Sequence, residues 1–544
     1  MTNFGITRWF LGKACKLPPR LSGRLDIRRD IPVVMRDGVS LLIDHYFIKT
    51  QQAGPVVLIR SPYGRGMIFG MMAALIAERG FQVIIQSVRG TSGSGGDIQP
   101  MRQEKADGAD TLNWIRKQDW FADKLFTFGS SYLGNVQWAM ACEAPDLIDA
   151  LVLSVTLSNF SDELVSFGGF TQAGTLSWTQ TELMMTEPGA KLQRPKPDSL
   201  DHAQKHLPLG TMDQAAFGKT VSWWQEWINH SNPNDPWWDA YDFSAAVKTL
   251  EVPTIMIGGW RDIFLPFQVR DFETRQAAGR EAWLTIGPWA HASAGGMVEA
   301  LRQAITTFTA LKDGQQAREN DRVRLYLQGA DIWREFPSWP PPEAKSLCFH
   351  LCADKQLSLS PATEEGAFTD YVYDPANPTP AIHGPILMGG KKDRDMKELE
   401  SRDDTVYFTS EALDRDLDVI GPVKADLSIH SDCEHTDFYV CLCDLDKKGR
   451  SLQVLDGYLR LRPEQPQADE SGVRHITIEC WPTAYRFKLG HKLRLIVASG
   501  AHPRYARNLG TGEALATATR MVVAHQKILH NSEHGSSLSL LYVD

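Results

Sequence analysis

Apolar and polar positions alternate along much of the N-terminal half in a way that predicts strands separated by helices. Met71 to Arg79 and Ala106 to Gln118 show helical spacing of apolar residues. Short apolar runs that read as buried strands precede, separate and follow them: Val56–Ile59, Phe81–Gln86, Leu125–Phe128, Ala150–Val155, Val252–Ile257 and Ala282–Ile286. Buried strands that alternate with helices predict an α/β fold with a mostly parallel sheet covered on both faces.

One long interruption separates the first four of these strands from the last two. Between Leu157 and Thr249 the strand runs disappear, and the pattern favours a helical insertion. Six of the 16 tryptophans fall in this segment: Trp178, Trp223, Trp224, Trp227, Trp237 and Trp238. Most of these rings are expected only to hold a small subdomain together.

The C-terminal part has a different pattern, which begins after the proline-rich stretch Ser338–Pro342. Short alternating strands recur there with turn residues between them, as in Thr405–Thr409, Lys492–Ala498 and Met521–His525. That spacing is typical of an all-β sandwich. We therefore expect an α/β core in residues 1–156 and 250–340, a helical cap in 157–249 and a jelly-roll β-sandwich in 341–544.

Composition and charge exclude several classes of function. The net charge is −9, and no dense block of Lys or Arg is present to follow a phosphate backbone, so we expect no nucleic-acid partner. No run of about 20 apolar residues predicts a membrane span. The 8 cysteines form no C-x-x-C pair, which fits a reducing compartment, and we expect a cytoplasmic protein. The N-terminal Met1–Leu17 predicts a short amphipathic helix or an arm that packs on the body of the protein.

The strand Leu125–Phe128 leads into a tight turn and then a helix, with Ser131 at the apex. A serine on such a strained strand–turn–helix connection presents its hydroxyl as a nucleophile above a helix N-terminus. Gly129 and Gly134 leave room for the bend. The alternative is an ordinary connection in which the serine only caps the helix. The usual G-x-S-x-G pattern is not met, because Leu133 occupies its last position.

Two further polar residues follow strands in the order expected for a serine nucleophile. Asp262 comes after Val252–Ile257, and His291 comes after Ala282–Ile286. Serine needs a base to take its proton, and a carboxylate that orients a histidine supplies one. The carboxyl ends of parallel strands meet at one edge of a sheet, so Ser131, Asp262 and His291 are candidates for a catalytic triad. We expect no metal ion and no organic cofactor. The glycine-rich stretch Arg89–Gly96 lacks the order of a nucleotide-binding loop.

These motifs, and others in the same order along nearly the whole chain, resemble the CocE/NonD family of α/β-hydrolases. That family includes cocaine esterase, α-amino acid ester hydrolases and X-prolyl dipeptidyl peptidases. The matching stretches are Met35–Val39, Ser61–Gly64, Val88–Gly90, Gly129–Gly134, Gly258–Asp262, Gly287–His291, Tyr373–Pro380, Trp481–Thr483 and Pro503–Asn508.

The resemblance implies a role for each matching residue. Ser131 matches the nucleophile, Asp262 the acid and His291 the base. The Tyr63 hydroxyl and the backbone N–H of Tyr132 match the two donors of the oxyanion hole. It also implies an α/β-hydrolase core with an inserted helical cap and a C-terminal jelly roll. Two aromatic residues are candidates for the acyl pocket by the same correspondence: Phe264 and Trp178.

The resemblance leaves the substrate open. We expect a small-molecule ester or, second, an amide as the partner. An acyltransferase with the same triad, or a non-catalytic binding protein, are the rivals. Family members that select a free α-amino group use extra acidic residues around the pocket. Glu163, Glu182 and Glu187 lie in the predicted cap, but the sequence does not place them near Ser131. The chain also lacks the extra segments of X-prolyl peptidases, and Ser87 replaces a family aspartate. The oligomeric state stays open, with a homodimer as one arrangement.

Overall fold

The computed structural model of the chain describes residues 4–186, 197–318, 321–385, 387, 395–463 and 467–544. These residues form two compact units. Unit 1 comprises Met1–Phe160, Thr179–Gln193 and Trp238–Arg324, and unit 2 comprises Ser161–Trp178, Arg194–Trp237 and Leu325–Asp544.

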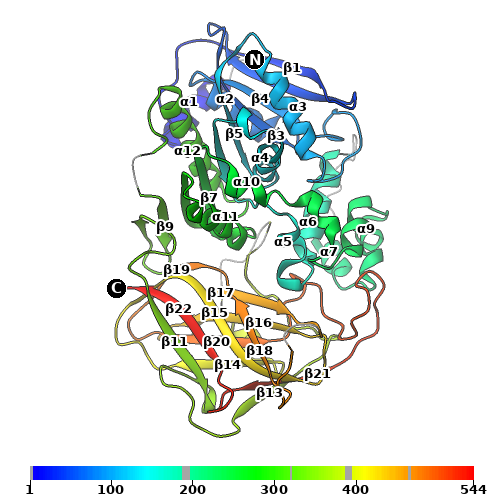
Figure 1. The fold of residues 1–544 in the computed structure, drawn as a ribbon, viewed down its shortest axis with the longest axis vertical. Helices are drawn as coiled ribbons and strands as arrows, with labels where there is room; N and C mark the ends of the chain where they lie inside the picture. The colour runs from blue at the N-terminus through cyan, green and yellow to red at the C-terminus, as the bar shows by residue number, and fades with distance from the viewer. Residues whose placement is uncertain (1–3, 187–196, 319–320, 386, 388–394, 464–466) are drawn as a thin grey trace. The chain divides into compact units, whose positions relative to one another are not determined.

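Unit 1 is built on a mixed sheet that contains the six strands predicted from the apolar runs (Figure 1). Within this sheet, strands β1 to β8 are ordered β1-β2-β4-β3-β5-β6-β7-β8. The pairs from β4 to β8 are parallel, and β1 and β2 are antiparallel additions at one edge. The strands are β1 Leu25–Val34, β2 Ser40–Ile48, β3 Gly54–Ser61, β4 Gln82–Ser87, β5 Phe121–Ser130, β6 Ala150–Ser154, β7 Thr254–Arg261 and β8 Ala282–Ala290.

Helices cover the sheet because their apolar faces pack on its buried strands. Helix α4 contacts β5, helix α11 contacts β7 and β8, and helix α12 contacts β6 and β7. The rings of Phe126 on β5 and Phe308 on α12 stack with centroids 4.7 Å apart, and both are fully buried. The helices of this unit outside the β6–β7 segment are α1 Phe4–Ala14, α2 Met67–Ala77, α3 Glu104–Arg116, α4 Tyr132–Glu143, α11 Leu265–Ala277 and α12 Ala294–Lys312, with the 3₁₀ turn η1 Pro145–Leu147.

The segment between β6 and β7 is helical in the described residues, as the loss of strand runs predicts. Trp224 and Trp227 are fully buried, so these rings do hold the segment together. The segment is divided between the two units, and its predicted boundaries stay a prediction. Its elements are α5 Ser161–Leu164, η2 Ser166–Gly168, α6 Gln172–Thr186, α7 Pro197–Ala203, η3 Leu209–Thr211, α8 Met212–Phe217, α9 Ser222–Asn229, η4 Pro236–Tyr241 and α10 Ser244–Thr249.

Unit 2 contains a 12-stranded, largely antiparallel sheet system in the order β13-β21-β15-β22-β11-β12-β14-β20-β16-β17, with β18 and β19 paired to the long strand β15 (Figure 1). Its elements are β11 Lys345–Cys352, η5 Ala353–Lys355, β12 Gln356–Ser358, β13 Phe368–Tyr373, α13 Lys397–Glu400, β14 Thr405–Ser410, β15 Leu417–Ser431, β16 Asp437–Leu445, β17 Ser451–Arg460, β18 Arg474–Glu479, β19 Thr483–Phe487, β20 Lys492–Ala498, β21 Ala524–Leu529 and β22 Ser537–Val543. Two short strands precede it, β9 Val323–Leu327 and β10 Ile332–Phe336.

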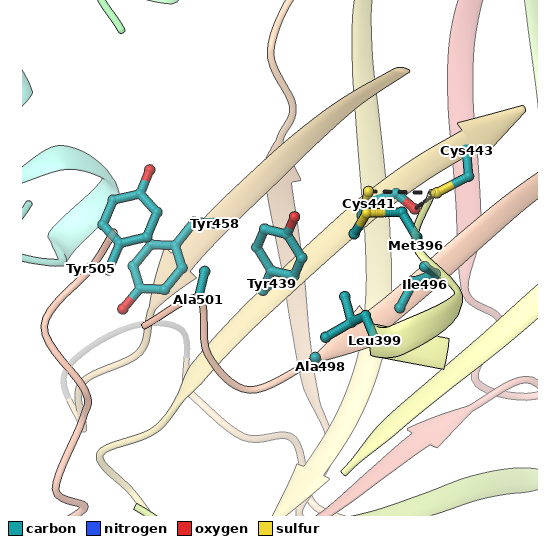
Figure 2. Close-up of a cluster of buried hydrophobic side chains, with 10 residues drawn as sticks. All are labelled: Met396, Leu399, Tyr439, Cys441, Cys443, Tyr458, Ile496, Ala498, Ala501 and Tyr505. Carbon is teal, nitrogen blue, oxygen red and sulfur yellow. Dashed lines mark hydrogen bonds between the residues drawn. The ribbon is translucent and has the colours of Figure 1, made fainter. Parts of the chain in front are cut away.

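A buried cluster shows how the alternating strands of unit 2 build a core. Side chains from β16, β17, β20 and α13 meet there (Figure 2). Cys441 and Cys443 point to the same side of β16, with their Sγ atoms 3.6 Å apart, as the strand period of two requires. Tyr458 and Tyr505 stack with ring centroids 3.9 Å apart.

The expected fold class, an α/β core with an inserted helical cap and a C-terminal jelly-roll domain, is confirmed. The predicted N-terminal helix is present as α1. Among the described residues, no helix has both the length and the apolarity needed to cross a membrane.

Candidate active site

The turn between β5 and α4 holds Ser131 in a strained conformation. Its φ of 59° and ψ of −125° lie where side chains are rarely tolerated. The Ser131 N–H donates to the Ser154 carbonyl at 2.9 Å, and the Ser131 carbonyl accepts from the Thr156 hydroxyl at 2.8 Å. These bonds fix the bend, so the hydroxyl stands above the first turn of α4.

Glycine is required on both sides of this bend because other chain atoms approach closely. A Cβ atom at Gly129 would lie 2.4 Å from the Leu133 side chain, and one at Gly134 would lie 2.6 Å from Thr156. Neither neighbour can move without displacing the helix or β6. The two glycines singled out in the sequence therefore have steric reasons to be there.

The three residues predicted as a triad are brought together at the carboxyl end of the sheet. His291 Nε2 lies 2.9 Å from Ser131 Oγ, and His291 Nδ1 lies 2.6 Å from Asp262 Oδ2. The Asp262 side chain is fully buried, and the His291 side chain is 8% exposed. A buried carboxylate at this distance fixes the imidazole with its proton on Nδ1 and its lone pair toward the serine.

Phe264 contacts both Asp262 and His291. Its backbone N–H donates to Asp262 Oδ1 at 2.9 Å, so each carboxylate oxygen has one partner. Its ring packs edge-on against the His291 imidazole, with centroids 5.2 Å apart. Phe264 therefore contacts the candidate catalytic base His291 directly, while its expected role as a wall of the acyl pocket stays a prediction.

Tyr63 lies beside the serine turn, at the carboxyl end of β3. It is half-buried, and its ring centroid is 6.4 Å from that of Tyr132, the residue after Ser131. Phe69 stacks on the Tyr63 ring, with ring centroids 6.3 Å apart. This packing limits the positions open to the phenol. The assignment of the Tyr63 hydroxyl as an oxyanion donor stays a prediction.

The side chain of Tyr132 is anchored in a buried polar network that sequence reasoning missed. Its hydroxyl donates to Glu104 Oε1 at 2.8 Å and accepts from the Met101 N–H at 2.9 Å. Glu104 also accepts from Arg60 Nη1 at 2.5 Å, and Arg60 donates to Gln86 at 2.7 Å. The Tyr132 N–H is the second expected oxyanion donor. The network therefore fixes the side chain of the residue whose backbone would bind the oxyanion.

The two neighbouring tyrosines allow a matched test of the oxyanion assignment. Tyr63→Phe removes the proposed donor hydroxyl and changes the side-chain volume little. We therefore expect kcat to fall by about 10²–10³-fold with a small change in KM. Tyr132→Phe removes a structural hydroxyl and leaves the backbone donor, so we expect a lower unfolding temperature and a smaller loss of kcat. Steady-state kinetics and thermal unfolding of both variants check this. The reverse ranking of kcat would show that Tyr63 is a packing residue.

Glu182, one of the three cap acids considered from the sequence, lies in the same unit as this network. It is completely buried, and neither carboxylate oxygen has a hydrogen-bond partner among the described residues. Burial, together with the negative charge of Glu104, raises the pKa of Glu182 to about 8. The group is therefore protonated at neutral pH. Glu163 lies in unit 2, and Glu187 lies outside the described residues.

This raised pKa predicts how stability depends on pH. Between pH about 4.5 and about 8 the folded chain keeps a proton on Glu182 that the unfolded chain has released. Stability therefore falls with rising pH through this range, by about 1.4 kcal/mol per pH unit from this group. Glu182→Gln removes the effect, so we expect its unfolding temperature relative to wild type to rise from pH 5 to pH 9. Glu251→Gln, at an 80% exposed carboxylate of the same unit, is the control and should show no such trend. A difference in unfolding temperature between Glu182→Gln and wild type that is the same at all pH values would contradict the prediction.

Trp178 is the one predicted site residue that belongs to unit 2. Its ring contacts the rings of Trp223 and Trp227, with centroids 6.4 Å and 5.8 Å away. Its assignment to the acyl pocket stays a prediction.

The chain matches two families that together span most of its length. The family described as X-Pro dipeptidyl-peptidase (S15 family) matches residues 37–293, and the X-Pro dipeptidyl-peptidase C-terminal non-catalytic domain matches residues 315–539. The chain is 28% identical to the cocaine esterase of Rhodococcus sp. (strain MB1 Bresler), over 96% of this chain and 99% of that protein.

Solved structures with the same fold cover almost the whole chain. An aminopeptidase from the marine sediment archaeon Thaumarchaeota archaeon superimposes with a TM-score of 0.83 at 20% identity, over 97% of this chain and 99% of the other. An α-amino acid ester hydrolase superimposes with a TM-score of 0.81 at 22% identity, over 97% and 98%. At these identities the likeness concerns the fold.

Proposed function

Because the chain belongs to the CocE/NonD family of serine hydrolases, we propose that it cleaves an acyl ester through an acyl-enzyme formed on Ser131. The observation that carries the proposal is the continuous hydrogen-bonded path from Ser131 Oγ through His291 to Asp262, at 2.9 Å and 2.6 Å. The path needs no rearrangement to transfer a proton. Neither a metal ion nor an organic cofactor is required by these groups.

In the first half of the reaction, Ser131 Oγ attacks the ester carbonyl carbon while its proton passes to His291 Nε2. The carbonyl oxygen becomes negatively charged, and the Asp262 carboxylate stabilises the imidazolium that forms. The bond between the carbonyl carbon and the alcohol oxygen then breaks. His291 returns the proton to the leaving alcohol, and the acyl group remains on Ser131.

We expect two donors to meet the developing charge on the carbonyl oxygen. The Tyr132 N–H opens helix α4, whose N-terminal dipole favours a negative charge. The Tyr63 hydroxyl is the second donor. In the second half of the reaction a water molecule gives its proton to His291 Nε2 and attacks the acyl carbon. The acid leaves, and Ser131 regains its proton.

An ester substrate without a free α-amino group is favoured by the state of Glu182. An ammonium group needs an ionised and accessible carboxylate, whereas Glu182 is completely buried and its pKa is about 8. This supports a plain esterase over a hydrolase that selects α-amino acyl groups. An X-prolyl or α-amino acyl peptidase is the alternative that family membership keeps open.

The proposal is tested by measuring hydrolysis of aryl esters of graded acyl length beside anilides with the same acyl groups. We expect turnover of the esters, with kcat/KM for each ester far above that for its anilide. Faster cleavage of X-prolyl or α-amino acyl anilides than of the matched simple esters would favour the peptidase. Added alcohols or amines test acyl transfer, because a transferase would yield new esters or amides in place of the free acid.

The expected role of Phe264 in acyl selection is tested with the same aryl esters of graded acyl length. Burial of an aromatic wall against a bulky acyl group contributes about 25 cal/mol for each Å² removed from water. We expect Phe264→Ala to lower kcat/KM more for bulky or aromatic acyl esters than for acetyl esters, beyond the common loss from its contact with His291. Trp178→Ala should show the same selectivity. Equal losses across the series would show that these rings only support the fold.

A further inference from the structure

Two histidines and an aspartate from separate segments of unit 2 converge at one place. Asp469 lies in the connection that precedes β18, His475 lies on β18, and His534 lies in the turn between β21 and β22. His475 Nε2 is 3.6 Å from Asp469 Oδ2, and His534 Nδ1 is 3.9 Å from the same oxygen. One ligand atom of each residue lies within 4.8 Å of the other two.

The aspartate presents only one of its oxygens to the histidines. Asp469 Oδ1 accepts three hydrogen bonds, from the N–H groups of Ser471 and Val473 at 2.9 Å and from the Ser471 hydroxyl at 2.6 Å. These bonds form a tight turn that fixes the carboxylate. Oδ2 is left facing the two imidazoles.

The hydrogen bonds around His475 determine which of its nitrogens has the lone pair. The Ser428 hydroxyl donates its proton to the Gly535 carbonyl at 2.8 Å. The same hydroxyl lies 3.0 Å from His475 Nδ1, so it accepts from that nitrogen. In the neutral imidazole, Nε2 therefore has the lone pair, and it faces Asp469 Oδ2.

The same logic applies to His534. The Ser471 hydroxyl gives its proton to Asp469 Oδ1, so toward His534 Nε2, at 3.4 Å, it can only accept. His534 Nδ1 then has the lone pair. This nitrogen is buried and has no hydrogen-bond partner among the described residues. Three electron-pair donors thus converge with no proton between them.

We propose that Asp469, His475 and His534 form a binding site for a divalent transition-metal ion, with Zn²⁺ as the best match. Two imidazoles and one carboxylate are ligands that zinc prefers, and a water molecule would complete a tetrahedron. Metal–ligand bonds of about 2.0–2.1 Å place tetrahedral ligands about 3.3 Å apart. The distances of 3.6 Å and 3.9 Å from Asp469 Oδ2 need to shorten only modestly, and the two histidine nitrogens, which lie within 4.8 Å of each other, would approach further. The hydroxyls of Ser428 and Ser471 are outer partners of the kind that orient metal-binding histidines.

This ion would cross-link three segments of unit 2: the connection before β18, β18 itself and the β21–β22 turn. Binding to the folded chain alone raises the unfolding temperature with metal concentration. The site is independent of the proposed ester hydrolysis, and its variants are expected to keep esterase activity. That activity also reports that each variant is folded.

The test uses the full-length chain, stripped of metal with a chelator and dialysed against Zn²⁺, with bound zinc measured by mass spectrometry. We expect a single Zn²⁺ ion per chain, and loss of binding in His475→Ala and His534→Ala. Ser428→Ala and Ser471→Ala keep all three ligands, so we expect affinity to fall by about 10–100-fold. His525→Ala is the control, because His525 pairs with Asp432 at 2.7 Å in an exposed position and is not a member of the cluster.

Substitution of Co²⁺ for Zn²⁺ gives a second readout. Visible bands of tetrahedral cobalt without a thiolate charge-transfer band would support nitrogen and oxygen ligands. A wild-type chain that binds no zinc would overturn the proposal and leave a cluster in which one histidine is protonated against Asp469. Binding that survives in His475→Ala and His534→Ala would overturn it as well, because the ion would then sit elsewhere.

Discussion

Replacement of Ser131 with alanine should lower kcat by about 10⁴–10⁶-fold for every ester that the protein cleaves. Ser131 Oγ is the proposed nucleophile that forms the covalent bond to the acyl group, and it lies 2.9 Å from His291 Nε2, the proposed base. The backbone bonds that hold the turn do not involve this side chain. The unfolding temperature should therefore stay close to that of the wild type.

Ser130 provides the matched control. It is the adjacent serine, at the end of β5, and occupies the variable position of the motif. Ser130→Ala should keep most of the activity. If Ser130→Ala were inactive and Ser131→Ala active, the register of the motif would be wrong.

Asp262→Asn should lower kcat by about 10⁴-fold with little change in the fold. Asp262 Oδ1 accepts from the Phe264 N–H, so the amide oxygen of asparagine is expected to keep that position. The amide NH₂ would then face His291 Nδ1, 2.6 Å from the present Oδ2. A donor there forces the proton of the imidazole onto Nε2, and the base can no longer accept from Ser131.

The tautomer argument is checked by pairing this change with Ser131→Ala. Because the three residues act as a unit, the double variant should be about as slow as Ser131→Ala alone. If the fold-loss in kcat of the double variant equalled the product of the two single losses, Asp262 would act independently of the serine. A normal kcat in Asp262→Asn would mean that another group orients His291.

The sequence predicted the sheet well, because buried parallel strands produce continuous apolar runs. Val56–Ile59 lies within β3, and Ala282–Ile286 lies within β8. The C-terminal strands were harder to delimit: the run at Met521–His525 overlaps only the start of β21 at Ala524–Leu529. Alternating strands contain fewer consecutive apolar residues, so their ends are less marked.

The candidate triad was also accessible from sequence, since each residue follows a strand that ends at the same edge of the sheet. The network behind it was not. Arg60 is a charged residue at the end of a buried apolar run, which signals a buried partner, but nothing in the sequence identifies Glu104 as that partner. The cluster of Asp469, His475 and His534 was missed for a similar reason. His534 is distant in the chain from Asp469 and His475, and the pairing of β18, β21 and β22 with β15 brings it close to them.

The substrate class depends on residues that the triad does not reveal. Solved structures of the same fold include an aminopeptidase and an α-amino acid ester hydrolase, so the fold alone does not separate esters from amides. The proposal of a neutral acyl group rests on Glu182, whose pKa is raised to about 8 by burial and by the charge of Glu104. Its pH-dependent stability can be measured without any substrate.

The central claim, that Ser131 is the nucleophile of a serine hydrolase, is tested most directly by covalent labelling with a fluorophosphonate and peptide mapping by mass spectrometry. We predict that the added mass lies on Ser131, and that labelling is lost in Ser131→Ala and strongly slowed in His291→Ala. A label on a different serine, or no label on a folded chain, would contradict the account.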